Sequence, residues 1–152
     1  MNKRLLMIAI FCGPMLGSAF AGTQEWTSGW GMGVNEYQIS DSNGNELAIY
    51  CPDDKATGVM SAVALVNGKK YSSKGSGTEQ FDIIVDGELY SNPFYTDCRA
   101  CDANFPAFWE AFRAANELAI SASGETISLP TTKLNELLHP YENVLNSCKS
   151  DW

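Results

Sequence analysis

The chain has few cationic side chains and a single histidine. Ten lysines and arginines stand against 18 aspartates and glutamates in 152 residues, a net charge of −8. Phosphates repel so acidic a surface, so nucleic acids and anionic membranes are poor expected partners and a cationic protein is the natural complement. The one histidine, His139, directly precedes Pro140, where a structural role is commoner than that of a catalytic base.

The sequence also lacks an apolar run of the roughly 20 residues that a membrane-spanning helix needs. Its longest apolar stretch, residues 5–16, is broken by a Gly-Pro pair. Lys3 and Arg4 precede this stretch, and residues 19–21, Ala-Phe-Ala, follow it with a small-x-small pattern. Together these features predict a signal peptide over residues 1–21, cleaved before Gly22, and hence a periplasmic or secreted protein.

No internal repeat, linker or low-complexity tract divides the rest of the chain, so residues 22–152 are expected to form one domain. Removing 21 residues from 152 leaves 131, enough for a substantial core. Loss of Lys3 and Arg4 leaves 8 of the 10 basic residues against 18 acidic ones, a net charge of −10. The predicted mature protein is therefore strongly acidic.

An even number of cysteines predicts disulfides. With Cys12 in the signal peptide, four remain: Cys51, Cys98, Cys101 and Cys148. In a small exported domain this count favours two disulfides, and the sequence leaves all three pairings open.

The first two thirds of the mature chain predict antiparallel β-structure. Apolar and polar residues alternate around Tyr37 and Ile39 and again from Phe81 to Val85. Residues 59–66 are apolar at both alternating sets of positions, which predicts a strand covered on both faces. Residues 71–78, rich in Ser, Gly and Lys, predict a mobile loop. Hairpin turns are expected at Asn43-Gly44, Asn67-Gly68 and Asp86-Gly87.

The last third changes to helical spacing. Aromatic residues from Asn104 onward predict a helix over residues 104–117, with Pro106 in its first turn. A short hairpin is expected around Gly124. A second helix is predicted over residues 131–147, kinked or ended by Pro140. The fold class is α+β: mainly an antiparallel sheet or sandwich, with an aromatic-rich helix, a C-terminal helix and stabilising disulfides.

Cys98-Arg99-Ala100-Cys101 is the one motif that could carry catalysis. At a helix start its first thiolate would be favoured, as in thiol–disulfide oxidoreductases, with Cys98 as nucleophile and Cys101 as resolving thiol. Asp97 disfavours that thiolate, and no βαβ pattern precedes the motif, so a structural disulfide is the preferred interpretation. A zinc site would need four nitrogen or sulfur ligands, so no metal and no cofactor is predicted.

Residues 91–96 offer candidate binding residues. Phe94 and Tyr95 lie in this loop, and the acidic residues Asp97 and Asp102 follow it. Aromatic side chains among acids make a plausible anchor for a cationic protein, although they could equally cover a sheet edge. The other paired carboxylates fall in turns, where aspartate is favoured for its local hydrogen bonds, so no enzymatic activity is predicted.

The sequence shows two resemblances to known families, one over part of the chain and one over the whole of it. The layout of residues 105–138, an aromatic helix, a hairpin around Gly124 and a Leu-bearing helix after Ile127-Ser128-Leu129-Pro130, is similar to the end of the invasion-associated locus B family. The whole chain, with its signal peptide, acidic domain and four cysteines, resembles two groups of periplasmic proteins. These are the immunity proteins that neutralise peptidoglycan-cutting effectors of type VI secretion, and the lysozyme inhibitors. No functional residue carries over from either resemblance.

These observations predict a periplasmic binding protein of the immunity or inhibitor type, which neutralises a cationic cell-wall hydrolase by direct contact. The state of association is left open, a homodimer included. The alternatives are a thiol–disulfide oxidoreductase and an envelope or virulence factor of the invasion-associated type.

Overall fold

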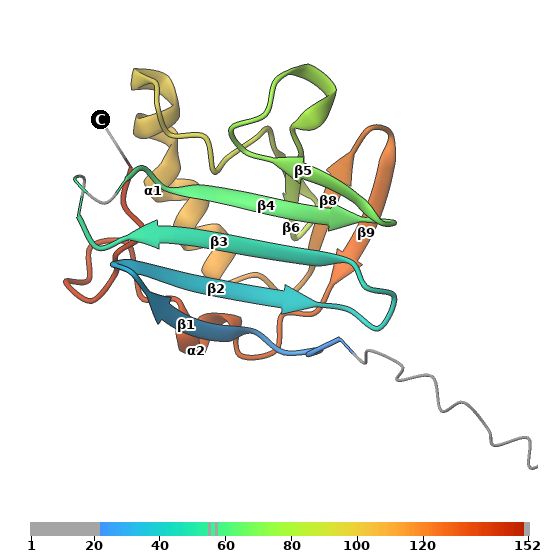
Figure 1. Cartoon of the computed structure of the whole chain (residues 1–152), viewed down its shortest axis with the longest axis horizontal. Helices are drawn as coiled ribbons and strands as arrows, with labels where there is room; N and C mark the ends of the chain where they lie inside the picture. The colour runs from blue at the N-terminus through green and yellow to red at the C-terminus, as the bar shows by residue number, and fades with distance from the viewer. Residues whose placement is uncertain (1–21, 55, 57, 151–152) are drawn as a thin grey trace, which may run out of the picture.

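The computed structural model describes residues 22–54, 56 and 58–150. The predicted signal peptide lies outside them. The described chain forms two antiparallel sheets, in the orders β1-β2-β3-β4-β5 and β7-β6-β8-β9. Helix α1 (Arg99–Arg113) and the second sheet lie behind the first sheet in the view of Figure 1. The predicted α+β class, mainly antiparallel β, is confirmed.

The strands of the first sheet are β1 (Thr27–Gly31), β2 (Val34–Ser40), β3 (Glu46–Pro52), β4 (Ser61–Val66) and β5 (Lys69–Ser72). Those of the second are β6 (Asp82–Val85), β7 (Glu88–Tyr90), β8 (Leu118–Ala122) and β9 (Glu125–Leu129). The three predicted hairpin turns and the hairpin around Gly124 are confirmed by the strand pairing. Strand β1 was not predicted. The predicted loop 71–78 begins inside β5 and contains a short 3₁₀ helix, η1 (Gly77–Glu79).

The core lies between the first sheet on one side and α1 with the second sheet on the other. In β4 the inward residues Ala62, Ala64 and Val66 are fully buried, whereas the alternate positions are only half-buried. The prediction of a strand covered on both faces is therefore wrong. One face of a two-layer antiparallel sheet meets solvent, and apolar residues at such positions are covered only by their neighbours on that face.

Helix α1 starts five residues before the predicted position. Cys98 caps it, and the amide of Asp102 donates to the carbonyl oxygen of Cys98 at 2.8 Å, so the first turn forms ahead of Asn104. Pro106 is consequently the eighth residue of α1 and lies inside the helix, against the first-turn prediction. The aromatic stripe is buried as expected: Phe105, Phe108, Trp109 and Phe112.

The predicted C-terminal helix over residues 131–147 is wrong except for one turn, α2 (Leu134–Leu137). Lys133 enters α2 with a φ of 65°, and Leu138 leaves it with extended backbone. The remaining chain is held by specific contacts in place of helical ones. The side-chain amide of Asn146 donates to the carbonyl oxygens of Tyr141 and Cys148, and Cys148 is joined to the first sheet by a disulfide.

Asp41 fixes the hairpin between β2 and β3, and this makes the stability of the protein sensitive to acid. Its carboxylate accepts hydrogen bonds from the Asn43 amide at 2.8 Å and from the amide and side chain of Asn45 at 2.9 and 2.8 Å. Partial burial alone would raise the pKa of Asp41, but these bonds from Asn45 and Asn43 hold it below its ordinary value.

We therefore expect Asp41→Asn to lower the free energy of unfolding at pH 7 by about 1 to 2 kcal/mol, because it removes charge-assisted hydrogen bonds. Since the folded-state pKa lies below the unfolded value of about 3.9, the carboxylate's contribution is complete above that pH and disappears as the pH falls through the folded-state pKa. Urea unfolding at pH 7 and pH 3 measures both effects. A difference between variant and wild type that stays constant over this range would contradict the assignment.

Candidate functional site

The loop between β7 and α1, predicted as a binding loop, turns its two aromatic residues in different directions. Phe94 is fully buried, with edge-to-face ring contacts to Phe108 and Phe112 at centroid distances of 5.2 and 5.5 Å. Its prediction as an exposed binding residue is wrong, because the aromatic face of α1 takes it into the core. Tyr95 is 37% exposed and remains available to a partner.

Asp97 and Asp102 flank the start of α1, where Cys98 and Cys101 form a disulfide. Asp97 is exposed and Asp102 is half-buried. The Cys98 sulfur accepts a hydrogen bond from the Cys101 amide at 3.1 Å and so caps the helix. Both sulfur-bearing residues are half-buried, so this disulfide lies at the surface.

A groove of about 460 Å³ borders the same disulfide. It runs between the loop after β7 and the first turns of α1. Its wall is largely apolar and includes Leu89, Tyr90, Pro93, Tyr95, Cys101 and Phe105. Leu89, at 57% exposure, and Tyr95 stand among the groove's lining residues and reach solvent.

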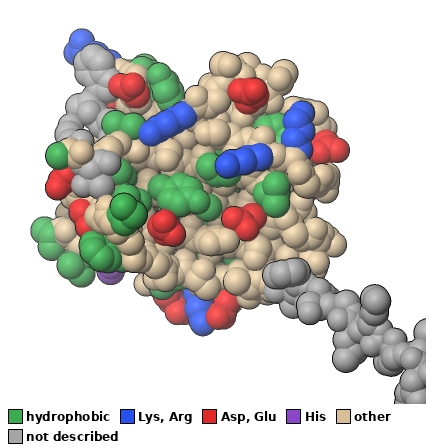
Figure 2. Space-filling model, viewed as in Figure 1, with side chains coloured by type: hydrophobic (Ala, Val, Ile, Leu, Met, Phe, Trp, Pro, Cys, Tyr) green, Lys and Arg blue, Asp and Glu red, His purple; other side chains and the backbone are tan. Residues whose placement is uncertain are grey.

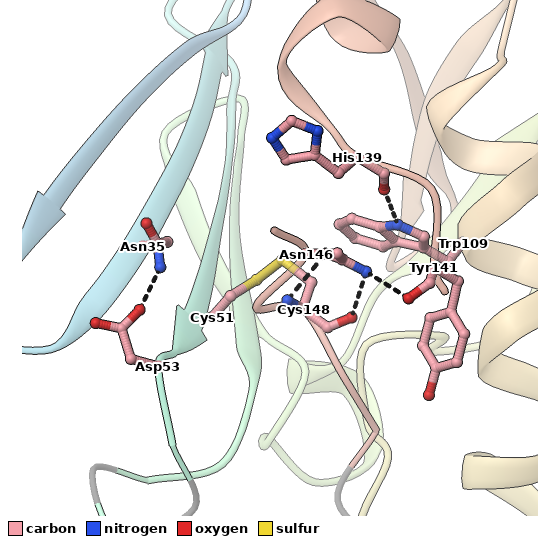
Figure 3. Close-up of a disulfide and its surroundings, with 8 residues drawn as sticks. All are labelled: Asn35, Cys51, Asp53, Trp109, His139, Tyr141, Asn146 and Cys148. Atoms are coloured by element: carbon pink, nitrogen blue, oxygen red, sulfur yellow. Dashed lines mark hydrogen bonds between the residues drawn. A yellow bond between two sulfur atoms is a disulfide. The ribbon is translucent and has the colours of Figure 1, made fainter. Parts of the chain in front are cut away.

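The second disulfide joins Cys51 of β3 to Cys148 and is fully buried (Figure 3). Nearby, the Trp109 indole donates to the carbonyl oxygen of His139 at 2.9 Å. The backbone of His139 thus serves to hold the C-terminal segment against α1. The Cys51–Cys148 disulfide cross-links the same segment to β3.

A site that the sequence did not reveal lies at the β1–β2 hairpin. Trp30 is the penultimate residue of β1 and Met32 stands at the tip, and they are 66% and 95% exposed. Trp30 is nevertheless held in place, because its indole N–H donates to Oδ2 of Asp53 at 2.8 Å. The other oxygen of Asp53 accepts from the Asn35 side chain at 2.5 Å (Figure 3).

Met32 occupies a backbone conformation that suits other residues better. Four hairpins in the structure have two-residue turns with positive φ at both positions, and the first of these positions has φ between 49° and 53° in all four. In the other three this position is held by a small polar residue: Asn67, Asp86 or Ser123. Asn and Asp tolerate this region well, whereas a long apolar side chain gains nothing from it.

Two hollows connect this hairpin to Tyr95. One, of about 480 Å³ on the outward face of the first sheet, is lined in part by Met32, Tyr50 and Val59. The next, of about 250 Å³, shares Val59 and Lys74 with it and reaches Tyr95 and Asp97. In Figure 2 hydrophobic side chains gather at this end of the sheet, where β2 begins and β3 ends. We call Met32, Val59 and Tyr95, with Trp30 at the same end of the sheet but on its opposite face beside Asn35, the apolar end surface.

Carboxylates border the apolar end surface. Burial, and then the nearby charges of Glu36 and Glu46, raise the pKa of Tyr50 in the first hollow. Burial also raises the pKa of Tyr37, the neighbouring Ser147 side chain opposes this shift, and the charge of Asp53 adds to it. Both phenols are therefore neutral at physiological pH. The carboxylates give this surface a negative local charge, which Lys74 in the two hollows partly offsets.

Within residues 22–54, 56 and 58–150, no group of three or more His, Cys, Asp or Glu residues is placed to hold a metal ion. In the same part of the chain no helix has both the length and the apolar character needed to cross a membrane.

The family profile named YfjT matches residues 24–138, that is 115 of the 152 residues. The chain belongs to the YfjT family. The match spans both sheets, α1 and the Cys98–Cys101 pair, and it ends before Cys148. It names none of the families that the sequence resembles. No curated protein and no solved structure matches the chain.

Proposed function

We propose that this member of the YfjT family is an exported binding protein that neutralises a cationic cell-wall hydrolase by direct contact. It works in the periplasm as an immunity or inhibitor protein, and the apolar end surface is its contact site. Two disulfides fit an oxidising compartment, which supports the exported location.

The observation that carries this proposal is Met32. A turn of this geometry is better served by Asn or Asp, and a methionine that is 95% exposed adds no buried apolar area to the isolated domain. Residues held in costly conformations cluster at sites of function, so the cost at Met32 indicates a contact made with a partner.

Trp30 is the second anchor on this surface. Tryptophan is enriched among the few interface residues that dominate binding energy. Its bond to Asp53 fixes the indole before a partner arrives, which reduces the entropy lost on binding. The surrounding acids would accelerate the approach of a cationic protein, and this effect weakens as salt rises.

The test uses purified cationic lysozymes, peptidoglycan amidases and endopeptidases as probes, with the full mature chain and calorimetry at low and physiological salt. We expect at least one probe to bind and to lose enzymatic activity in the complex. Trp30→Ala should weaken that binding about 30-fold or more, as for a typical interface anchor. Met32→Asn should weaken binding while the thermal midpoint stays unchanged or rises, because Asn suits the turn.

Thr126→Ala is the matched control, since Thr126 is exposed on β9 of the other sheet. It should bind as the wild type does. The proposal fails if no cationic hydrolase binds even at low salt. It also fails if the Trp30 and Met32 variants bind a probe as tightly as the Thr126 variant.

A further inference from the structure

We propose that the Cys98–Cys101 disulfide is a thiol-exchange site that oxidises cysteine-bearing polypeptides, and that the groove beside it holds an apolar side chain of the substrate. This activity is separate from the proposed inhibitor function, and its groove shares Tyr95 with the apolar end surface.

The two disulfides differ in access. Cys51 and Cys148 are fully buried, whereas Cys98 and Cys101 are both half-buried at the start of α1. Exchange requires a thiolate to reach a disulfide sulfur, and of the two disulfides among the described residues Cys98–Cys101 is the one whose residues solvent reaches. Cys98 and Cys101 are separated by only 3 positions along the chain, so opening their disulfide leaves the Cys51–Cys148 link between β3 and the C-terminal segment intact.

The surroundings of the Cys98–Cys101 disulfide favour a thiolate at Cys98 over one at Cys101. The Cys98 sulfur accepts the N–H of Cys101 at 3.1 Å and stands at the positive end of α1. This contact is retained by a Cys98 thiolate and favours it directly. Asp97 acts in the opposite direction, but it is exposed, so water screens its charge.

The groove supplies a reason for a polypeptide substrate. Cys101 forms part of its wall, together with apolar side chains that include Tyr95 and Phe105. Its volume of about 460 Å³ suits one large apolar side chain with its neighbouring backbone. A substrate with an aromatic or aliphatic residue near its cysteine would therefore be held with its sulfur close to the disulfide.

The chemistry balances with two substrate thiols as the reductant. A substrate thiolate attacks the Cys98 sulfur, a mixed disulfide forms, and Cys101 leaves as a thiolate that takes up the released proton. The second substrate thiolate then attacks the substrate sulfur of the mixed disulfide and releases Cys98 as a thiolate. The substrate ends with one disulfide, and the protein ends with two reduced cysteines.

The experiment mixes the oxidised mature chain with two reductants in separate reactions: a synthetic peptide carrying two cysteines beside a phenylalanine, and glutathione. Alkylation and mass spectrometry follow the thiols. We expect one peptide disulfide to form per protein, with label appearing on Cys98 and Cys101 and none on Cys51 and Cys148. The protein should oxidise the peptide at least ten times faster than the isolated oxidised hexapeptide of residues 97–102 does.

Leu89→Ser separates the groove from the disulfide itself. Leu89 lines the groove and is exposed, so the fold should tolerate the change. The variant should oxidise the peptide several-fold more slowly and react with glutathione at the wild-type rate, and Thr126→Ala should change neither. Equal rates for the protein and the hexapeptide, or an equal change toward both reductants, would overturn the proposal. Neither result bears on binding of a hydrolase at Trp30 and Met32.

Discussion

Replacing both Cys51 and Cys148 by alanine is expected to lower the free energy of unfolding by about 4 to 5 kcal/mol. The bond joins residues separated by 97 positions, so in the chain-entropy model its removal frees a long loop in the unfolded state. Both residues are fully buried, so the change also leaves unfilled space in the core. Small domains have a total stability of about 5 to 15 kcal/mol, so much of the margin would be lost.

The matched control is the double alanine variant of Cys98 and Cys101. Its loop has a sequence separation of only 3, so the same model predicts a loss of about 2 kcal/mol. Urea unfolding of the two variants and the wild type compares them directly. Equal losses, or a larger loss for the Cys98 and Cys101 variant, would show that loop length does not govern the contribution of these bonds.

The hairpins of this fold could be predicted because the chemistry of their turns is local. A pair such as Asn67-Gly68 provides both positive φ values that a two-residue turn requires, whatever the rest of the chain does. The turn at Met32-Gly33 has the same geometry, but methionine is not a residue that such a turn favours, so the sequence did not predict it. An apolar residue before glycine, two positions after a tryptophan, is the signal that could have revealed the hairpin and its exposed anchor.

The predicted helix boundaries were wrong because the interactions that set them are not local in the sequence. The spacing of Leu134, Leu137 and Leu138 is helical, but Pro140 and the bonds of Asn146 hold the C-terminal segment in a non-helical path. The contact that matters most there is the disulfide of Cys148 to Cys51, and its partner cannot be known from spacing alone. The start of α1 was missed because Cys98 is an uncommon residue to cap a helix.

The candidate site was predicted only in part for a similar reason. Phe94 and Tyr95 are adjacent aromatics in one loop, and the sequence offers no means of deciding which one is buried. The structure decides it through α1, which receives Phe94 between Phe108 and Phe112. Tyr95 then reaches solvent, and its amide closes a turn onto the carbonyl oxygen of Asn92 at 3.1 Å.

This division gives the second prediction of large effect: Phe94→Ala should lower the free energy of unfolding by about 3 to 5 kcal/mol. The variant removes a fully buried ring and its edge-to-face contacts, and leaves a cavity that the sheets and α1 cannot close. Tyr95→Ala should change stability by about 0.5 kcal/mol or less, because a substitution at an exposed position seldom does more.

The Phe94→Ala and Tyr95→Ala variants also separate the contribution of this loop to stability from its contribution to function. Chemical denaturation should distinguish the two variants clearly. The Tyr95→Ala protein should keep its full stability, but it should bind a hydrolase less tightly and oxidise a phenylalanine-bearing peptide more slowly. Phe94→Leu should recover part of what Phe94→Ala loses, since it restores apolar volume without the ring. A Phe94→Ala protein as stable as the wild type would mean that Phe94 lies at the surface, and Tyr95 would then be the residue that anchors the loop.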